Sequence, residues 1–149
     1  MTKQAGSDVA DALSELLAST YTLYLKTQNY HWNVTGPMFT TLHTLFETQY
    51  TELATAVDEI AERIRSVGAR APGSFSAFSA LTTVKEETGH PDAKTMIRTL
   101  VKDQGAITDV ARRVIDVAEP QRDQATVDLA TRRLDVHEKN AWMLRSHLD

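Results

Sequence analysis

With 149 residues, 42% of them hydrophobic and 24% charged, and a net charge of -4, the chain suits one soluble globular domain over residues 1–149. The small negative charge argues against strong overall attraction to nucleic acid, and the absence of cysteine excludes disulfides, thiolate metal sites and cysteine nucleophiles. No secretory signal pattern is visible, and no run approaches the ~20 apolar residues that a membrane span needs, so we expect a cytoplasmic protein.

The first half of the chain predicts two long helices. The first runs from about Ser7 to His31, and Ser7 or Asp8 can cap its start. Its apolar residues recur at helical spacing: Val9, Leu13, Leu16, Leu17, Tyr21, Leu23, Tyr24 and Leu25. Gly36 stops this helix and Pro37 opens the second, which runs to about Val67 and ends at Gly68.

The second half predicts a crossing segment and two more helices. The segment "ARAPGSFSAFSALTTVKEETGHP" places Phe75, Phe78 and Leu81 one turn apart, which indicates one short helix. Asp92 can cap the third long helix, and Glu119-Pro120 ends it. The fourth runs from about Asp123 to Leu148. No strand alternation is visible, so we expect an all-α fold: a ferritin-like four-helix bundle with a short extra helix in the long connection between helices two and three.

Two histidines flank the first turn at equal distances. His31 lies six residues before Pro37 and His43 six residues after it, so an antiparallel helix pair brings the two imidazoles to one level. On the second helix, His43 and Glu47 are four residues apart, as are Asp58 and Glu62, and each pair shares a face. The eleven residues from position 47 to position 58 turn the helix by ~1100°, so both pairs lie near one stripe.

A single chain does not bring enough of these ligands close together to bind one metal ion. His43 and Glu62 are nineteen residues apart, about 28 Å along a helix, whereas metal ligands lie within roughly 2.0–2.6 Å of the ion. A second copy, placed antiparallel about a two-fold axis near Glu52 and Leu53, brings the histidine end of one helix to the carboxylate end of the other. We therefore expect two identical intersubunit sites, with nitrogen and oxygen ligands that suit iron, manganese or zinc.

Other interpretations of these residues stay open on geometry alone. A lone histidine on an apolar face is usually a hydrogen-bonded core residue, and acids on a long helix usually form a solvated face with nearby arginines, here Arg63, Arg65 and Arg70. The neighbouring aromatic residues are more often core than functional: Tyr30, Trp32, Phe39 and Phe46.

The segments "NYHWNVTGPMFTTLHTLFETQY" and "AVDEIAERIRSVG" together resemble the Dps family, the mini-ferritins also called DNA-binding proteins from starved cells. The resemblance covers nearly the whole chain. It implies a dodecameric hollow shell with ferroxidase centres at two-fold interfaces. There Fe(II) is oxidised, with hydrogen peroxide commonly preferred over oxygen, and a ferric mineral is stored inside, which protects DNA from oxidative damage.

The same resemblance implies roles for single residues. His31 and His43 of one subunit and Asp58 and Glu62 of the other match the family's iron ligands, and their affinity should weaken as the histidines protonate. Glu47 matches a position that is often Asp, and Trp32 matches a tryptophan beside the centre that can donate electrons and trap radicals. Zinc or manganese are possible competitors for iron.

The family also takes up iron through an acidic pore at its three-fold axes. The matching region "PQRDQATVDLA" makes Asp123 and Asp128 the candidates. A helix cap at Asp123 and a surface charge at Asp128 are the alternative roles.

Direct DNA binding is not expected, despite the family name. Members that bind DNA often carry a tail rich in Lys or Arg, whereas "MTKQAGSDVADALSE" holds one lysine and three acids and the chain stops at "SHLD". A basic patch on the fourth helix would comprise Arg132, Arg133, Lys139 and Arg145, but pairing within the helix to Asp128, Asp135 and Glu138 is the simpler interpretation.

Two functions compete with an iron-oxidising store. One is a nucleoid-compacting structural protein, against which the missing basic tail counts. The other is a helical assembly protein with a vestigial metal site, against which the complete ligand set counts. A typical large ferritin or di-iron oxygenase, with Glu-x-x-His motifs on two helices, is not expected because those motifs are absent from the predicted helices.

Overall fold

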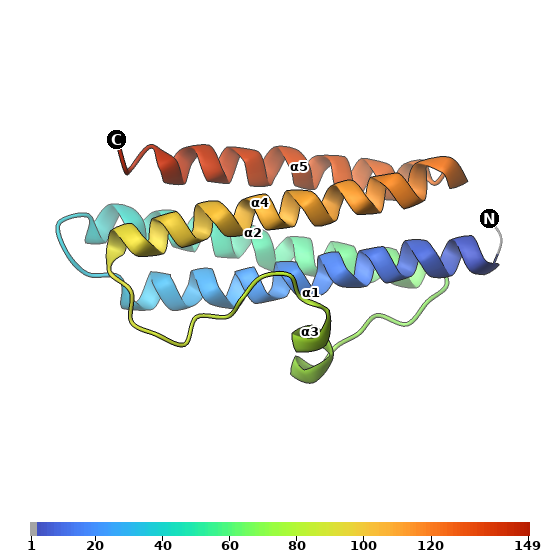
Figure 1. The fold of residues 1–149 in the computed structure, drawn as a ribbon, viewed down its shortest axis with the longest axis horizontal. Helices are drawn as coiled ribbons and strands as arrows, with labels where there is room; N and C mark the ends of the chain where they lie inside the picture. Colours follow the sequence, from blue (N-terminus) through green and yellow to red (C-terminus); the bar gives the residue numbers. More distant parts are fainter. Residues whose placement is uncertain (1–2) are drawn as a thin grey trace.

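The protein is described by a computed structural model over residues 3–149, which are helical or irregular throughout. Figure 1 shows the long helices side by side, with the short helix α3 lying beside them. The elements in chain order are α1 (Lys3–Asn33), α2 (Phe39–Ser66), α3 (Phe75–Leu81), α4 (Ala93–Ala118), the 3-10 turn η1 (Glu119–Gln121) and α5 (Gln124–Arg145). The predicted all-α bundle, with its short helix in the long connection, is confirmed.

The long helices form two antiparallel pairs that pack on each other. α1 and α2 make one pair and α4 and α5 the other, and α1 packs against α4. Because the segment containing α3 returns the chain to the opposite end of the bundle, α2 and α4 run in the same direction (Figure 1). No helix within residues 3–149 combines the length and apolarity that crossing a bilayer requires.

The apolar stripes predicted from helical spacing meet in one core. Their largest fully buried side chains are Leu13, Leu16, Leu17, Leu23, Tyr30, Leu42, Phe46, Leu53, Ile60, Ile64, Ile97 and Leu100. Each such side chain contributes roughly 1.5–3 kcal/mol by leaving water. On α2 the buried positions leave the opposite face exposed, and that face carries the predicted carboxylates.

Several helix boundaries differ from those predicted. α1 begins at Lys3, so the proposed cap at Ser7 or Asp8 is wrong, because nothing in the preceding residues stops a helix. α2 begins at Phe39 rather than Pro37, since Gly36 to Met38 form a turn closed by the Phe39 amide donating to the Gly36 carbonyl at 3.0 Å. α5 ends at Arg145, and residues 146–148 continue as tighter turns rather than as α-helix.

The predicted caps of the later helices are present. The Asp92 carboxylate accepts from the Thr95 amide at 2.8 Å at the start of α4, and Asp123 caps α5 by accepting from the Thr126 amide at 3.2 Å. α4 ends at Ala118, immediately before Glu119-Pro120.

The connection after α3 is tied to α1 by three buried or half-buried side chains. The Ser19 hydroxyl accepts from the Thr83 amide at 3.0 Å, Lys26 Nζ donates to the Lys85 carbonyl at 2.7 Å, and the Tyr30 hydroxyl donates to Glu87 Oε1 at 2.5 Å. The residue numbers of the paired positions increase in the same order along α1 and along the connection, so the extended connection runs parallel to α1 (Figure 1).

The middle of the bundle holds a polar cluster rather than apolar side chains alone. Arg133 on α5, nearly fully buried, donates to both carboxylate oxygens of Glu52 on α2, at 2.5 and 2.9 Å. Its guanidinium also contacts His137 Nε2 at 3.0 Å, while His137 Nδ1 lies 2.6 Å from Gln104 Oε1 on α4. Burial, and then the Arg133 charge, hold the pKa of His137 well below its usual value, so this imidazole is neutral.

Candidate metal centre

The two predicted histidines lie face to face where α1 meets α2. Their rings stack with centroids 3.8 Å apart and an angle of 14° between planes. Each Nδ1 hydrogen-bonds the other residue's main-chain carbonyl: His31 Nδ1 to the His43 oxygen and His43 Nδ1 to the His31 oxygen, both at 2.7 Å. Because a carbonyl only accepts, both Nδ1 atoms carry a proton, and this is the tautomer of a neutral imidazole that has its lone pair on Nε2.

The turn at Gly36 produces this alignment. Gly36 has φ +104°, a conformation that an L side chain rarely adopts. The Val34 amide donates to the Tyr30 carbonyl at 3.0 Å, which carries the end of α1 into the turn. The chain therefore reverses with few residues, and positions 31 and 43 come to one level as predicted.

Two further aromatic rings surround the imidazole pair. Phe39 stacks on His43 with centroids 5.0 Å apart, and Tyr50 meets the edge of His31 at 5.2 Å. Tyr50 was not identified from the sequence. Its position seven residues after His43, two helical turns along α2, was the available signal.

The three carboxylates predicted as ligands lie on the exposed face of α2. Glu47, Asp58 and Glu62 are all exposed. A hydrogen bond with Asp58, and then the negative charge of Asp58, raise the pKa of Glu62 above its usual value, so the two carboxyl groups lie close together. A cation bound between them would relieve this repulsion.

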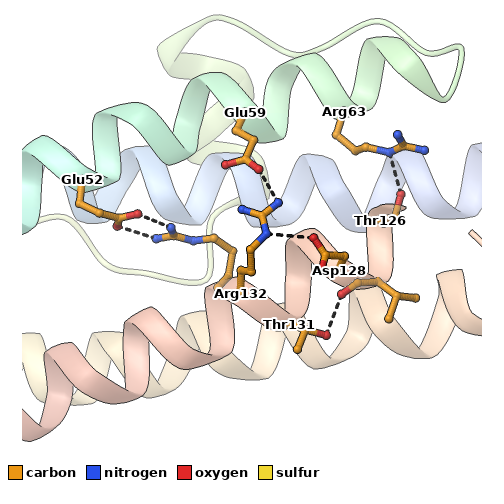
Figure 2. A network of polar contacts seen from close by, with 9 residues as sticks. Glu52, Glu59, Arg63, Thr126, Asp128, Thr131 and Arg132 are labelled. Atoms are coloured by element: carbon orange, nitrogen blue, oxygen red, sulfur yellow. Dashed lines mark hydrogen bonds and ion pairs between the residues drawn. The ribbon is translucent and has the colours of Figure 1, made fainter. Parts of the chain in front are cut away.

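Asp58 and Glu62 border a groove between α2 and α5, whose far wall includes Asp128 and Arg132. Figure 2 shows how charged pairs span these helices. Arg132 contacts Glu59 at 2.5 Å and Asp128 at 3.0 Å, and Arg63 Nε donates to the Thr126 hydroxyl at 3.0 Å. These contacts engage the arginines with residues other than the predicted ligands.

One chain does not assemble the predicted ligand set. Within residues 3–149, no group of three or more His, Asp or Glu side chains is placed to hold one metal ion. The histidines sit near the start of the unbroken helix α2, and Asp58 and Glu62 sit near its end. The centre shared with a second copy stays a prediction.

The remaining candidates have less direct placements. Trp32 is 60% exposed and borders a groove between α1 and the α3 segment. Within the described chain, its indole makes no ring contact with either imidazole of the pair. Its role as electron donor stays a prediction.

The pore candidates are engaged in the alternative roles considered for them. Asp123 is buried, caps α5 and pairs with Arg63 at 3.0 Å, whereas Asp128 is exposed and pairs with Arg132. Their place in a pore stays a prediction.

The pairing of charges within α5, preferred over a basic patch, is found only in part. Arg132 pairs within its helix with Asp128, as expected, but Arg133 is buried against Glu52. Glu138 pairs with Arg112 of α4 at 3.5 Å rather than within α5.

Comparisons with known proteins agree with this arrangement. The model of the ferritin-like domain family matches residues 10–149. The sequence is 34% identical over 141 residues to DNA protection during starvation protein 2 of Bacillus anthracis, covering 95% of this chain and 97% of that protein.

Two solved structures share the whole fold. A Dps protein from Bacillus brevis has a TM-score of 0.96 at 35% identity, with 100% of both chains covered. A Dps protein from Vibrio cholerae O1, described as a member of a broad superfamily of ferritin-like diiron-carboxylate proteins, has a TM-score of 0.95 at 33% identity, covering 100% of this chain and 94% of that one.

Proposed function

Because the chain belongs to the Dps proteins of the ferritin-like family, we propose that it oxidises Fe(II) at centres shared between two copies and stores the ferric product inside a hollow shell. Relatives are named for the protection of DNA during starvation, and one is described as a ferritin-like diiron-carboxylate protein. Iron storage and protection of DNA are the general roles that this membership supports.

The observation that carries the proposal is the reciprocal hydrogen bonding of His31 and His43. Each ring is fixed as the tautomer whose Nε2 lone pair is free, and the stacking holds the two rings together. Hydrogen bonds of this kind between ring N–H groups and carbonyl oxygens orient metal-binding histidines. A core histidine pair with a purely structural role would have no need to leave both Nε2 atoms free.

The second half of the centre comes from the exposed face of α2 in a partner copy. Positions 43 and 62, and positions 47 and 58, are equally far from one midpoint between residues 52 and 53. At that midpoint the exposed face carries the small side chains of Thr51 and Ala54, so two antiparallel copies of α2 can approach to about 8–10 Å. His43 then faces the partner's carboxylates at Asp58 and Glu62.

The residues divide the work by charge. Asp58 and Glu62 attract hydrated Fe(II), and the cation would relieve the repulsion from Asp58 that raises the pKa of Glu62. His31 and His43 supply neutral nitrogen donors, and Glu47 adds a carboxylate for a second iron. Two Fe(II) ions together give two electrons to one hydrogen peroxide, which takes up two protons and leaves as two water molecules, so no hydroxyl radical is released.

The wider assembly follows from this shared centre. We infer a dodecamer whose shell takes up iron past Asp128, with peroxide as the preferred oxidant and zinc or manganese as competitors at the centre. Trp32, exposed close to the imidazole pair in sequence, is an electron donor for stray radicals.

The test measures iron oxidation by the purified assembly. Fe(II) is loaded without oxygen, peroxide or oxygen is added, and ferric absorbance and soluble retained iron are followed. The parent protein should oxidise iron faster than buffer and keep it in solution. His31→Ala with His43→Ala should lose this advantage, while His90→Ala, in the exposed connection, should retain it. Oxidation no faster than in buffer by the parent would instead support a structural scaffold.

A further inference from the structure

A row of aromatic rings leads away from the imidazole pair along α1 and α2. Tyr50 meets His31 at 5.2 Å between centroids, Tyr24 meets Tyr50 at 6.0 Å, and Tyr21 meets Tyr24 at 5.7 Å. Beyond Tyr21 the row continues only as phenyl rings, with Phe78 at 4.9 Å and Phe75 at 6.5 Å. Three of the chain's four tyrosines therefore form one line that starts at the proposed metal ligands.

We propose that Tyr50, Tyr24 and Tyr21 form an electron-donor chain that supplies the second electron to peroxide when a centre holds only one iron, and that carries the resulting radical away from His31 and His43. This inference rests on the proposed ferroxidase function. Electron tunnelling falls steeply with distance, so rings in contact exchange electrons far faster than separated ones. Phenyl rings are much harder to oxidise than phenols, so the chain ends at Tyr21.

The need for such a donor follows from electron counting. Reduction of peroxide to water takes two electrons, and one Fe(II) gives only one, which would leave a hydroxyl radical beside the ligands. With Tyr50 as second donor, one Fe(II), one hydrogen peroxide, one tyrosine and one proton from water yield one Fe(III), two water molecules and one neutral tyrosyl radical. The O–O bond breaks, and iron and the phenol are the two species oxidised.

The phenol proton also has a destination. Tyr50, Tyr24 and Tyr21 are half-buried, and within residues 3–149 their hydroxyl groups form no hydrogen bond with a protein group. Each hydroxyl can therefore release its proton to water as its ring is oxidised. The radical moves from Tyr50 to Tyr24 and then to Tyr21, and at each step the next tyrosine gives up one electron and one proton while the previous one regains them. The radical therefore ends on Tyr21, two tyrosines beyond Tyr50.

The fourth tyrosine provides a matched control. Tyr30 neighbours His31 in sequence, but it is fully buried, donates to Glu87, and packs on Phe46 at 6.2 Å rather than on another tyrosine. Trp32 provides a second comparison, because its exposed indole makes no ring contact with the imidazoles in the described part of the chain.

The experiment uses the whole assembly loaded with Fe(II) far below one ion per centre, so that most occupied centres hold a single iron. Peroxide is added without oxygen, samples are frozen rapidly, and organic radicals are recorded by electron paramagnetic resonance. Protein grown with ring-deuterated tyrosine identifies the radical by a narrowed signal. Peroxide consumed per iron oxidised is measured in parallel, and it should be one to one, twice the ratio for two irons acting together.

The variants decide the outcome. Tyr50→Phe should lose the tyrosyl signal and release hydroxyl radical to a spin trap, whereas Tyr24→Phe should keep a signal, now confined to Tyr50 and with altered hyperfine structure. Tyr30→Phe should match the parent. A signal that disappears in Tyr30→Phe or Trp32→Phe but persists in Tyr50→Phe would overturn the chain. So would normal iron oxidation by the parent without any tyrosyl radical, which would leave the ferroxidase proposal standing. If the parent protein does not oxidise iron, both the ferroxidase proposal and the tyrosine chain are refuted.

Discussion

Two inactive variants of this protein should restore each other's activity when they assemble together. One carries His31→Ala and His43→Ala, and the other carries Asp58→Asn and Glu62→Gln. In the proposed centre, the histidines come from one copy and these carboxylates from its mate. A shell built from either variant alone therefore contains no complete centre.

The size of the restoration follows from the symmetry of the interface. In a dimer of one chain of each kind, one of its two centres receives both intact halves and the other receives both altered halves. Random mixing makes about half of the dimers mixed, so about a quarter of all centres are complete. A centre built within one chain predicts none, because every chain lacks half of its ligands.

The length of α2 excludes a rescue within one chain. The helix is continuous from Phe39 to Ser66, and its histidine and carboxylate ends are separated by about 28 Å along the axis. No local change in side-chain conformation spans that distance, since a glutamate side chain reaches only a small part of it.

The assay produces the two chains together with different affinity tags and purifies shells that carry both. Native mass spectrometry gives the mixing ratio, and anaerobic Fe(II) loading followed by peroxide gives the initial rate of ferric absorbance. Each variant mixed with itself is the baseline. Mixed shells that oxidise iron no faster than this baseline would refute the shared centre, and single-variant shells with parental rates would refute the ligand assignment.

Four further predictions test the fold and its surface. Glu52→Gln should lower the free energy of unfolding by about 3 kcal/mol because it leaves the buried Arg133 charge without a partner carboxylate. Glu59→Gln, in an exposed ion pair, should lower it by under ~1 kcal/mol. Equal losses of stability in urea unfolding at one protein concentration would contradict this. Gly36→Ala should lower the free energy of unfolding by about 1–3 kcal/mol because φ is +104°. Gly105→Ala, facing open space within α4, should raise it by about 1 kcal/mol. A higher melting temperature for Gly36→Ala than for Gly105→Ala would contradict both predictions. The hydrogen bond from Tyr30 lowers the pKa of Glu87, so its contribution to the free energy of unfolding is complete above the ordinary glutamate pKa and is lost as pH falls through the lowered value. The loss of stability caused by Tyr30→Phe should therefore shrink in that acid range, and a loss of stability that does not change with pH would refute the coupling. Duplex DNA should show no gel shift with the assembly in ~150 mM salt, and a clear shift would assign a nucleic-acid surface to the shell.

The features that the sequence predicted well are those that depend on local spacing. Apolar periodicity and the stops at Gly36 and Gly68 marked the long helices, because these signals act within a few turns. The pairing of His31 with His43 was also predictable, since a short turn fixes the level of residues on either side of it. Their ring hydrogen bonds to each other's carbonyls were not, because side-chain rotation is not encoded in spacing.

The features that were missed depend on contacts between distant segments. Arg133 was expected to pair within its own helix, but it is buried against Glu52, which lies 81 residues earlier in the chain. Tyr50 contacts His31 across two helices, and Asp123 joins Arg63 at the α2–α5 boundary. A charged or aromatic residue on a helix has several possible neighbours, and only the packing of the helices selects among them.

The polar cluster in the middle of the bundle favours the proposal that iron binds at the exposed face of α2 rather than in the bundle core. In ferritin-like di-iron proteins, carboxylates and histidines project into the bundle core to hold metal. In this protein the bundle holds the Arg133 guanidinium instead, which is paired with the Glu52 carboxylate and contacts one nitrogen of His137. A fixed cation that satisfies the available ligands leaves no net negative charge to bind a divalent ion there. In the proposed centre, the Nε2 atoms of His31 and His43 meet the exposed carboxylates of Asp58 and Glu62 only when a second chain is present, so iron oxidation there would depend on assembly.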